Sequence, residues 1–155
     1  AQTLLTLPRI LVVDEPTAGL DPRERIRFRN LLVELSRNRI VIFSTHIIED
    51  IASSCNQVGV INKGSVKYHG TPAEMAEIAK EVTWTFEIPA REFAQLSADL
   101  LIVHHIRNGE NIKVRCLSET PPVPTAVRTT PLLEDSYLWL LRSVKLANNE
   151  QIITQ

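Results

Sequence analysis

The stretch RILVVDEPTAGLDP, residues 9–22, joins a short apolar run to two adjacent carboxylates. Residues 9–13 are mostly apolar and β-branched, which predicts a strand that is buried on both faces of a parallel sheet. Asp14 and Glu15 follow directly. Like charges repel, so this pairing favours a site where one carboxylate meets a cation and the other faces a substrate. A turn that leads into a helix cap is the alternative explanation for an Asp-Glu dipeptide.

The residues that follow predict a helix and a second strand. Asp21 is a good N-cap, Pro22 suits the first helical position, and Glu24 completes a capping box. The stretch RIVIFSTH, residues 39–46, has the composition of a second buried strand, and a short helix is expected from residue 47 or 48. Strand, helix, strand and helix in this order predict parallel βαβ winding.

A hairpin and another helix are expected next. The stretch QVGVINKGSVKYHG, residues 57–70, favours a hairpin around Asn62-Lys63-Gly64. Thr71 and Pro72 repeat the capping pattern and begin a helix that is expected to end near Lys80.

A second small unit is expected after a boundary at residues 80–82. Its pattern is β-α-β-β-α, with a type I′ turn predicted at Asn108-Gly109 and a loop or sheet edge in the Pro-rich residues 118–130. The predicted fold class is α/β. Residues 1–80 would form part of a parallel sheet with an appended hairpin, and residues 82–155 a small α/β domain.

Composition bounds the possible functions. The chain is 44% hydrophobic and 23% charged, which is typical of a soluble globular protein. Its 17 Lys and Arg against 18 Asp and Glu give no overall attraction to nucleic acid or anionic lipid. The Arg-rich residues 22–30 are expected to form a solvated helix face. Cys55 and Cys116 lack a CxxC partner, so reduced thiols are expected, and the sequence shows neither a signal peptide nor a membrane-spanning apolar run.

Polar side chains follow both predicted strands. In an open parallel sheet, ligands bind at the carboxyl ends of the strands, where Asp14 and Glu15 end one strand and residues 44–46, Ser-Thr-His, end the other. This set suits metal-assisted phosphoryl transfer. One carboxylate would hold Mg²⁺ through water, the other would orient or deprotonate the attacking water, and a hydroxyl or imidazole would contact the γ-phosphate.

These motifs resemble a known family. ILVVDEPTAGLDP (10–22) resembles the Walker B strand and D-loop of ABC-type ATPases, and VIFSTH (41–46) resembles their switch-histidine segment. VGVINKGSVKYHGTPAEM (58–75) is similar to the hairpin and GTPxE helix of transporter ATPase subunits, and TPLLEDSYLWLL (130–141) to the tail of the exporter-like branch. The resemblance implies the ATP-binding subunit of an ABC transporter, with residues 1–80 as the C-terminal half of its P-loop NTPase domain.

The resemblance also implies residue roles. Asp14 would be the Walker B aspartate that is linked to Mg²⁺ through water, and Glu15 the catalytic base that polarises water. His46 would be the switch histidine that senses the γ-phosphate, with Ser44 and Thr45 beside it at the nucleotide.

Partners follow from the same resemblance. Asp21 in the D-loop would reach a second ATP-binding subunit of a dimer, and a transmembrane permease would provide the contact with the membrane. ATP and Mg²⁺ are the implied cofactors, no nucleic-acid partner is implied, and the expected location is the cytoplasmic face of the cell membrane.

Several motifs of the family are missing from this sequence. A phosphate loop needs G-x-x-x-x-G-K-[ST], and although Gly59 and Gly64 have the spacing, Ser65 stands where Lys is required. The Q-loop and signature motif are also absent, and AQTLLTLP (1–8) matches the segment just after the signature. We therefore expect a C-terminal fragment that alone neither binds ATP tightly nor hydrolyses it. Its uncovered strand edges would favour dimerisation.

Two alternatives remain open from the sequence. One is a soluble ABC-type ATPase of translation or DNA maintenance, although the neutral charge and the GTPxE segment argue against it. The other is a non-enzymatic regulatory or dimerisation module formed by residues 82–155.

Overall fold

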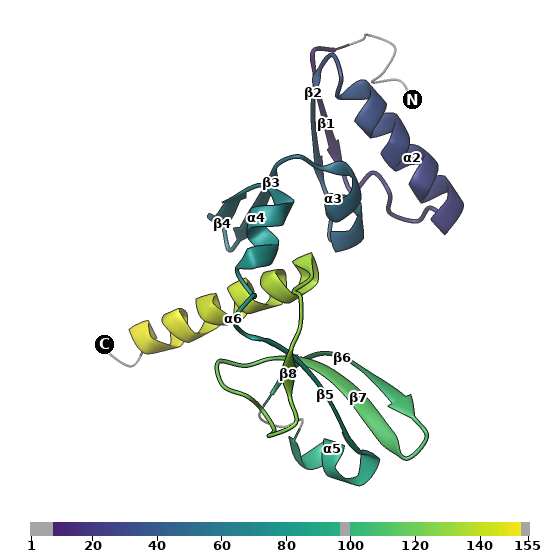
Figure 1. The fold of residues 1–155 in the computed structure, drawn as a ribbon. Coiled ribbons are helices and arrows are strands. Elements are labelled where there is room, and N and C mark those ends of the chain that lie inside the picture. The colour runs from purple at the N-terminus through teal and green to yellow at the C-terminus, as the bar shows by residue number, and fades with distance from the viewer. Residues whose placement is uncertain (1–7, 97–99, 153–155) are drawn as a thin grey trace. The chain divides into compact units, whose positions relative to one another are not determined.

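The computed structural model describes residues 8–96 and 100–152, which form an α/β structure with mixed sheets (Figure 1). Two compact units divide between Val58 and Gly59. Residues 1–7, which begin the segment that matches the region just after the signature motif, lie outside the described residues. The elements, in chain order, are β1 (Ile10–Asp14), α2 (Pro22–Leu35), β2 (Ile40–Ser44), α3 (Ile48–Ser54), β3 (Val58–Asn62), β4 (Ser65–Gly70), α4 (Pro72–Glu77), β5 (Thr83–Pro89), α5 (Ala90–Leu96), β6 (Leu101–Asn108), β7 (Asn111–Leu117), β8 (Val127–Arg128) and α6 (Leu133–Ile152).

The first unit is built on a β1-α2-β2 crossover, which confirms the predicted parallel winding. Strands β1 and β2 pair in parallel, and their last residues, Asp14 and Ser44, are register partners. The backbone N–H of Glu24 donates to Asp21 Oδ1 at 2.8 Å, so Asp21 caps α2 as expected, with Pro22 in the first turn. The helix α3 begins at Ile48, as predicted.

One face of the β1–β2 pair is exposed. Ile10, Val12, Ile40 and Ile42 alternate along the two strands and are 56%, 65%, 58% and 53% exposed, whereas Leu11 on the other face is 3% exposed. The expectation of two strands buried on both faces is therefore wrong within residues 8–58. The physical reason is that α2 runs along one side of the pair (Figure 1), and no element within residues 8–58 covers the opposite side chains.

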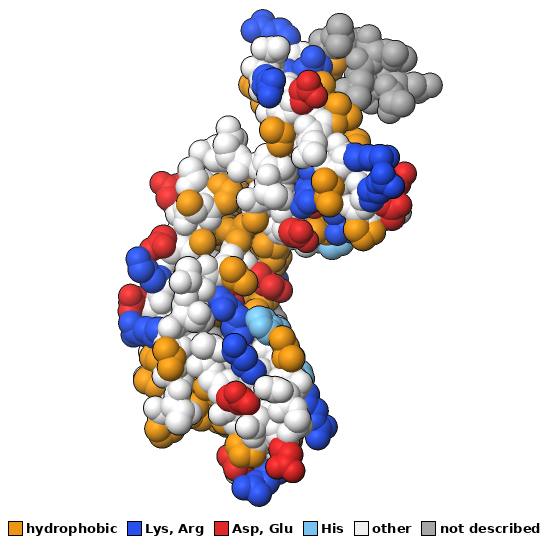
Figure 2. Space-filling model, turned by 45° about the vertical axis from the view of Figure 1, so that its right-hand side comes forward, with side chains coloured by type: hydrophobic (Ala, Val, Ile, Leu, Met, Phe, Trp, Pro, Cys, Tyr) orange, Lys and Arg blue, Asp and Glu red, His pale blue; other side chains and the backbone are white. Residues whose placement is uncertain are grey.

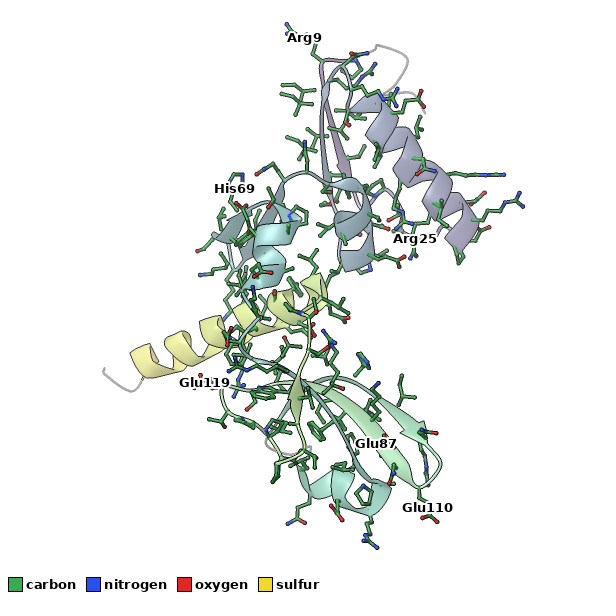
Figure 3. All side chains as sticks on the ribbon, in the orientation of Figure 1. Arg9, Arg25, His69, Glu87, Glu110 and Glu119 are labelled. Carbon is green, nitrogen blue, oxygen red and sulfur yellow. The ribbon has the colours of Figure 1, made fainter. Side chains whose placement is uncertain are left out.

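The Arg-rich helix α2 does not present all its arginines to solvent. The Arg29 side chain is only 12% exposed and lies against α3, where its Nη1 atom is 2.9 Å from Ser53 Oγ. Arg25, labelled in Figure 3, lies four residues before Arg29, and its Nε atom is buried. The solvated-face expectation therefore fails for Arg29, which contacts the neighbouring helix, and for the Nε atom of Arg25.

The second unit starts with the predicted hairpin. The turn between β3 and β4 is Lys63-Gly64, and both residues have positive φ, 48° and 73°, which is the pattern of a type I′ turn. Thr71 then caps α4 in a full capping box with Glu74, as expected. The helix ends at Glu77, before Lys80, and a turn leads into β5.

The predicted β-α-β-β-α pattern appears as a four-stranded antiparallel sheet in the order β6-β7-β5-β8. Helix α5 follows β5 and precedes β6 in the chain. The short β8 lies in the Pro-rich segment at the sheet edge, as expected. The β6–β7 turn is Gly109-Glu110, with positive φ only at Gly109, so the type I′ turn at Asn108-Gly109 is wrong. Asn108 pairs with Asn111 instead, which moves the turn by one residue and gives a type II′ sign pattern.

The core of this sheet gathers on one face. Alternate residues of β5 and β7 are buried together and pack against the apolar side of α5. The core residues are Trp84, Phe86, Ile88, Ile112, Val114 and Cys116. On the one face that Figure 2 draws, some hydrophobic side chains gather together and others lie among charged ones.

Helix α6 is tied to the second unit by two buried polar residues. Asp135 is fully buried and accepts hydrogen bonds from Arg115 of β7. Ser136 Oγ donates to Ala76 O of α4 at 2.8 Å and accepts from the N–H of Ala79 at 3.2 Å. The domain boundary at residues 80–82 stays a prediction. Across the described ranges, no helix is long and apolar enough to cross a membrane.

Candidate active site

Four of the predicted site residues lie together at the carboxyl ends of β1 and β2. The hydroxyl of Ser44 donates to Asp14 Oδ1, and the backbone N–H of Glu15 lies 3.1 Å from Ser44 O and 3.0 Å from Ser44 Oγ. His46 Nδ1 lies 2.9 Å from Glu15 Oε2. The parallel register of the strands explains this proximity, because it aligns Asp14 with Ser44 and places the next residues of both segments at one sheet edge.

Glu15 has an unusual backbone conformation. Its φ is 44°, in the left-handed region that residues other than glycine rarely adopt. The bifurcated hydrogen bond from its N–H to Ser44 fixes this conformation, and the N–H of Ala18 donates back to Glu15 O at 3.1 Å. Strained backbone of this kind concentrates at functional sites. In this conformation the Glu15 side chain contacts His46.

The site is open to solvent. The side chain of Glu15 is 37% exposed and that of His46 is 74% exposed. A water molecule or a phosphate group can therefore reach both side chains, and their mutual contact competes with water.

The other two predicted site residues have local partners. The hydroxyl of Thr45 accepts a hydrogen bond from the N–H of Ile47 at 3.0 Å, which stabilises the start of α3. Asp21 uses one carboxylate oxygen to cap α2 and is exposed. Neither side chain contacts the Asp14–Ser44 or Glu15–His46 pairs in the interactions of the described residues.

Three residues that the sequence did not single out contact one another next to the loop that carries Glu15. The Thr17 hydroxyl donates to Asp50 Oδ2 at 2.6 Å, and both side chains are buried. Arg29 Nη1 lies 3.5 Å from Asp50 Oδ1. Thr17 belongs to the loop after β1, Arg29 to α2 and Asp50 to α3, so one buried carboxylate joins three segments. A sequence pattern could not signal this contact, since the acid in the first turn of α3 looks like an ordinary helix-terminus charge.

A divalent cation fits the donors of this edge only in part. The Asp14 and Glu15 carboxylates and the Ser44 hydroxyl are hard oxygen donors, which suit Mg²⁺. Within the described part of the chain, no group of three His, Cys, Asp or Glu side chains could hold a metal ion. A cation here would thus keep waters and take ligands from a phosphate, as Mg²⁺ commonly does.

The cysteines do not add a nucleophile to the site. Both are free, and burial raises the pKa of the Cys55 thiol, with a further rise from the Asp50 charge that opposes the effect of the Ser54 hydrogen bond. Burial also raises the pKa of Cys116 to about 11. Both thiols therefore stay protonated at neutral pH.

Comparison with known proteins identifies the class to which the chain is related. Its curated relatives are ATP-binding proteins of ABC transporters, which supports a nucleotide-binding domain in this chain. No protein-family model matches it.

Three relatives illustrate the similarity. The uncharacterized ABC transporter ATP-binding protein YxlF of Bacillus subtilis is 27% identical over 154 residues, which cover 89% of this chain and 52% of that protein. The energy-coupling factor transporter ATP-binding protein EcfA2 of Bacillus licheniformis is 44% identical over 77 residues, 48% of this chain and 27% of EcfA2. A putative ABC transporter ATP-binding protein of Mycoplasma pneumoniae is 36% identical over 78 residues, 49% of this chain and 24% of its own length. The chain thus spans about half the length of YxlF and about a quarter of EcfA2.

Proposed function

We propose that this chain supplies the water-activating side of an ATP-hydrolysing site in the ATP-binding subunit of an ABC transporter. The observation that carries the proposal is the pair of contacts at one sheet edge, Ser44 with Asp14 and His46 with Glu15. Two carboxylates with separate partners can take separate roles, one toward a cation and one toward water. The names of the relatives support the same activity.

Glu15 would act as the general base. Its carboxylate is half-exposed, so an attacking water can donate a proton to it, and the His46 contact at 2.9 Å fixes the orientation of one oxygen. His46 uses Nδ1 for this contact, and Nε2 of its exposed ring would donate to an oxygen of the γ-phosphate only if both ring nitrogens carry a proton, because the carboxylate and the phosphate are both acceptors. The imidazole would thereby connect the base with the phosphoryl group that the water attacks.

Asp14 would face the metal side. The Ser44 hydroxyl donates to Asp14 Oδ1 and so restricts the rotation of that carboxylate. Mg²⁺, when bound through water at Asp14, would neutralise charge on the phosphate oxygens. In the same proposal, Ser44 and Thr45 border the nucleotide, and Asp21 contacts a second ATP-binding subunit.

The chain alone would be inactive. Phosphate affinity in P-loop proteins comes from backbone N–H groups and the Lys of a phosphate loop, and this sequence contains no such motif. We expect isothermal titration calorimetry of this chain with ATP and Mg²⁺ to detect no binding at micromolar concentrations. Binding with a micromolar dissociation constant would contradict the proposal for the isolated chain.

The activity itself is tested in a full-length parent protein. There Glu15→Gln should abolish turnover and leave ATP binding nearly unchanged, because the amide keeps the size of the side chain but cannot accept the proton of water. Glu110→Gln, at an exposed residue of the β6–β7 turn, is the matched control and should have normal turnover. Normal turnover of Glu15→Gln would refute the role of Glu15 as base.

The remaining parts of the proposal concern the whole protein. A transmembrane permease and a second ATP-binding subunit would be its partners, and the cytoplasmic face of the membrane its location. Residues 82–155 would form an accessory domain, which the separate apolar core of the β5–β7 sheet supports. Copurification of the full-length protein with a membrane protein tests the first part. Expression of residues 82–155 as a folded, cooperatively unfolding domain tests the second.

A further inference from the structure

The buried carboxylate of Asp50 contacts the loop that carries Glu15. It is 0% exposed, accepts the Thr17 hydroxyl at 2.6 Å and lies 3.5 Å from Arg29 Nη1. Thr17 is itself only 1% exposed. A hydrogen bond to a buried charged group is strong, because neither partner can exchange it for a bond to water.

Three contacts join the two segments that leave β1 and β2. Asp14 meets Ser44, Glu15 meets His46 and Thr17 meets Asp50, in the same order along both segments. The middle contact is exposed and competes with water, whereas the third is buried. The third contact therefore restricts where the first residues of the loop, including Glu15, can lie relative to His46.

The Asp50 carboxylate contacts both the loop and the helix that follows it. The N–H of Leu20 donates to Thr17 O at 3.2 Å, which folds the loop back before α2 begins. Arg29 then returns from α2 to Asp50 and to Ser53 of α3. Asp50 of α3 thus joins the loop, through Thr17, to α2, through Arg29, and only its bond with Thr17 acts directly on the loop that carries Glu15.

We infer that Thr17 and Asp50 are a positioning pair for the base Glu15. Their hydrogen bond keeps the loop of residues 15–21 in the conformation that sets Glu15 against His46. This inference rests on the proposed function for its effect on turnover, but its effect on the loop concerns this chain alone.

The first experiment measures loop order in this chain. Thr17→Val keeps the shape of the side chain and removes its hydroxyl, and Thr17→Ser restores the hydroxyl. Thr85→Val is the matched control, because its hydroxyl bonds Val114 O at 3.2 Å in the second unit. Hydrogen–deuterium exchange of the Ala18 and Leu20 amides should accelerate by about tenfold or more in Thr17→Val, since loss of a charged, buried bond has that scale.

The exchange result has two clear outcomes. Faster exchange confined to residues 15–21, with Thr17→Ser close to wild type and Thr85→Val unchanged in this loop, supports the inference. Unchanged loop exchange in Thr17→Val overturns it, and so does equal acceleration at the β1 and β2 amides, which would indicate a general loss of stability.

The second experiment measures ATP turnover in the full-length parent. Thr17→Val should lower kcat by about tenfold while KM for ATP changes less than twofold, because the pair orients the base and does not touch nucleotide. Thr17→Ser should recover most of kcat. A lower kcat in Thr17→Val that Thr17→Ser restores supports the inference. A kcat of Thr17→Val equal to that of the wild type overturns its catalytic part. A wild-type parent without ATPase activity would instead refute the proposed function, and the exchange experiment would still decide the effect on the loop.

Discussion

The buried ion pair between Arg115 and Asp135 provides the sharpest test of how the second unit is held together. Asp135 is 0% exposed and accepts from Arg115 Nε at 3.0 Å, from Arg115 Nη2, and from the N–H of Leu132 at 2.6 Å. The Arg115 side chain is 13% exposed. Asp135→Asn keeps the shape of the residue but removes the charge that compensates the guanidinium.

Breaking a buried pair leaves an uncompensated charge, which destabilises a protein by about 3–5 kcal/mol. We expect the lower end of that range, about 3 kcal/mol, because Arg115 keeps its bond to Thr130 O at 2.8 Å and a small access to water. Urea unfolding followed by the tryptophan fluorescence of the chain, which includes Trp84 in the core of the same sheet and Trp139, measures the change in free energy of unfolding.

Glu81→Gln is the matched control for this substitution. It neutralises the carboxylate in the ion pair with Arg128, in which the Glu81 side chain is 70% exposed and the Arg128 side chain 51% exposed. Exposed ion pairs contribute about 0–1 kcal/mol to the free energy of unfolding. Arg115→Met combined with Asp135→Asn should be less destabilising than the sum of the single changes, since no lone buried charge remains. A loss of less than 1 kcal/mol for Asp135→Asn, or one equal to that of Glu81→Gln, would refute the reasoning.

Three further predictions concern local features. Ellman's reagent at pH 8 should modify Cys116, whose pKa is about 11, only after unfolding in urea, and should modify Cys55 before it; rapid modification of both thiols in the folded chain would contradict this. Thr71 hydrogen bonds hold the pKa of Glu74 below its ordinary 4.5, so this stabilisation is present above pH 4.5 and is lost as the pH falls through the folded pKa. The stability difference between wild type and Glu74→Gln should therefore narrow on acidification, and a difference that stays constant would show that the charge is not responsible. Gly64→Ala should destabilise the chain by about 1 kcal/mol because φ is 73° there, whereas Gly59→Ala, at an ordinary φ, should not, and equal urea midpoints for the two variants would exclude the backbone explanation.

Local sequence signals predicted the elements that depend on near neighbours. The caps at Asp21 and Thr71, the Lys63-Gly64 turn and the parallel order of β1 and β2 all rest on contacts within a few residues or on strand–helix alternation. The turn at Gly109 shows the limit of such signals, because strand register moved it by one residue against its dipeptide preference.

The sequence by itself determined which residues gather at the sheet edge. An apolar strand that ends in Asp14 and Glu15, and a second that ends in residues 44–46, suffice to place carboxylates and an imidazole together, since parallel strands end at one edge. The resemblance to ABC-type ATPases depends on the same short motifs, and the relatives agree with it.

Only the tertiary structure decided which side chain meets which. Contacts between residues about 30 positions apart, such as Thr17 with Asp50, depend on the docking of α3 beside the loop, and no local preference encodes that distance. The tertiary structure also decided the left-handed backbone conformation of Glu15 and the burial of Arg29 beside Asp50. It decided as well that the Ile and Val face of β1 and β2 is exposed. Burial and charge pairing are properties of packed surfaces, so they appear only when the elements have come together.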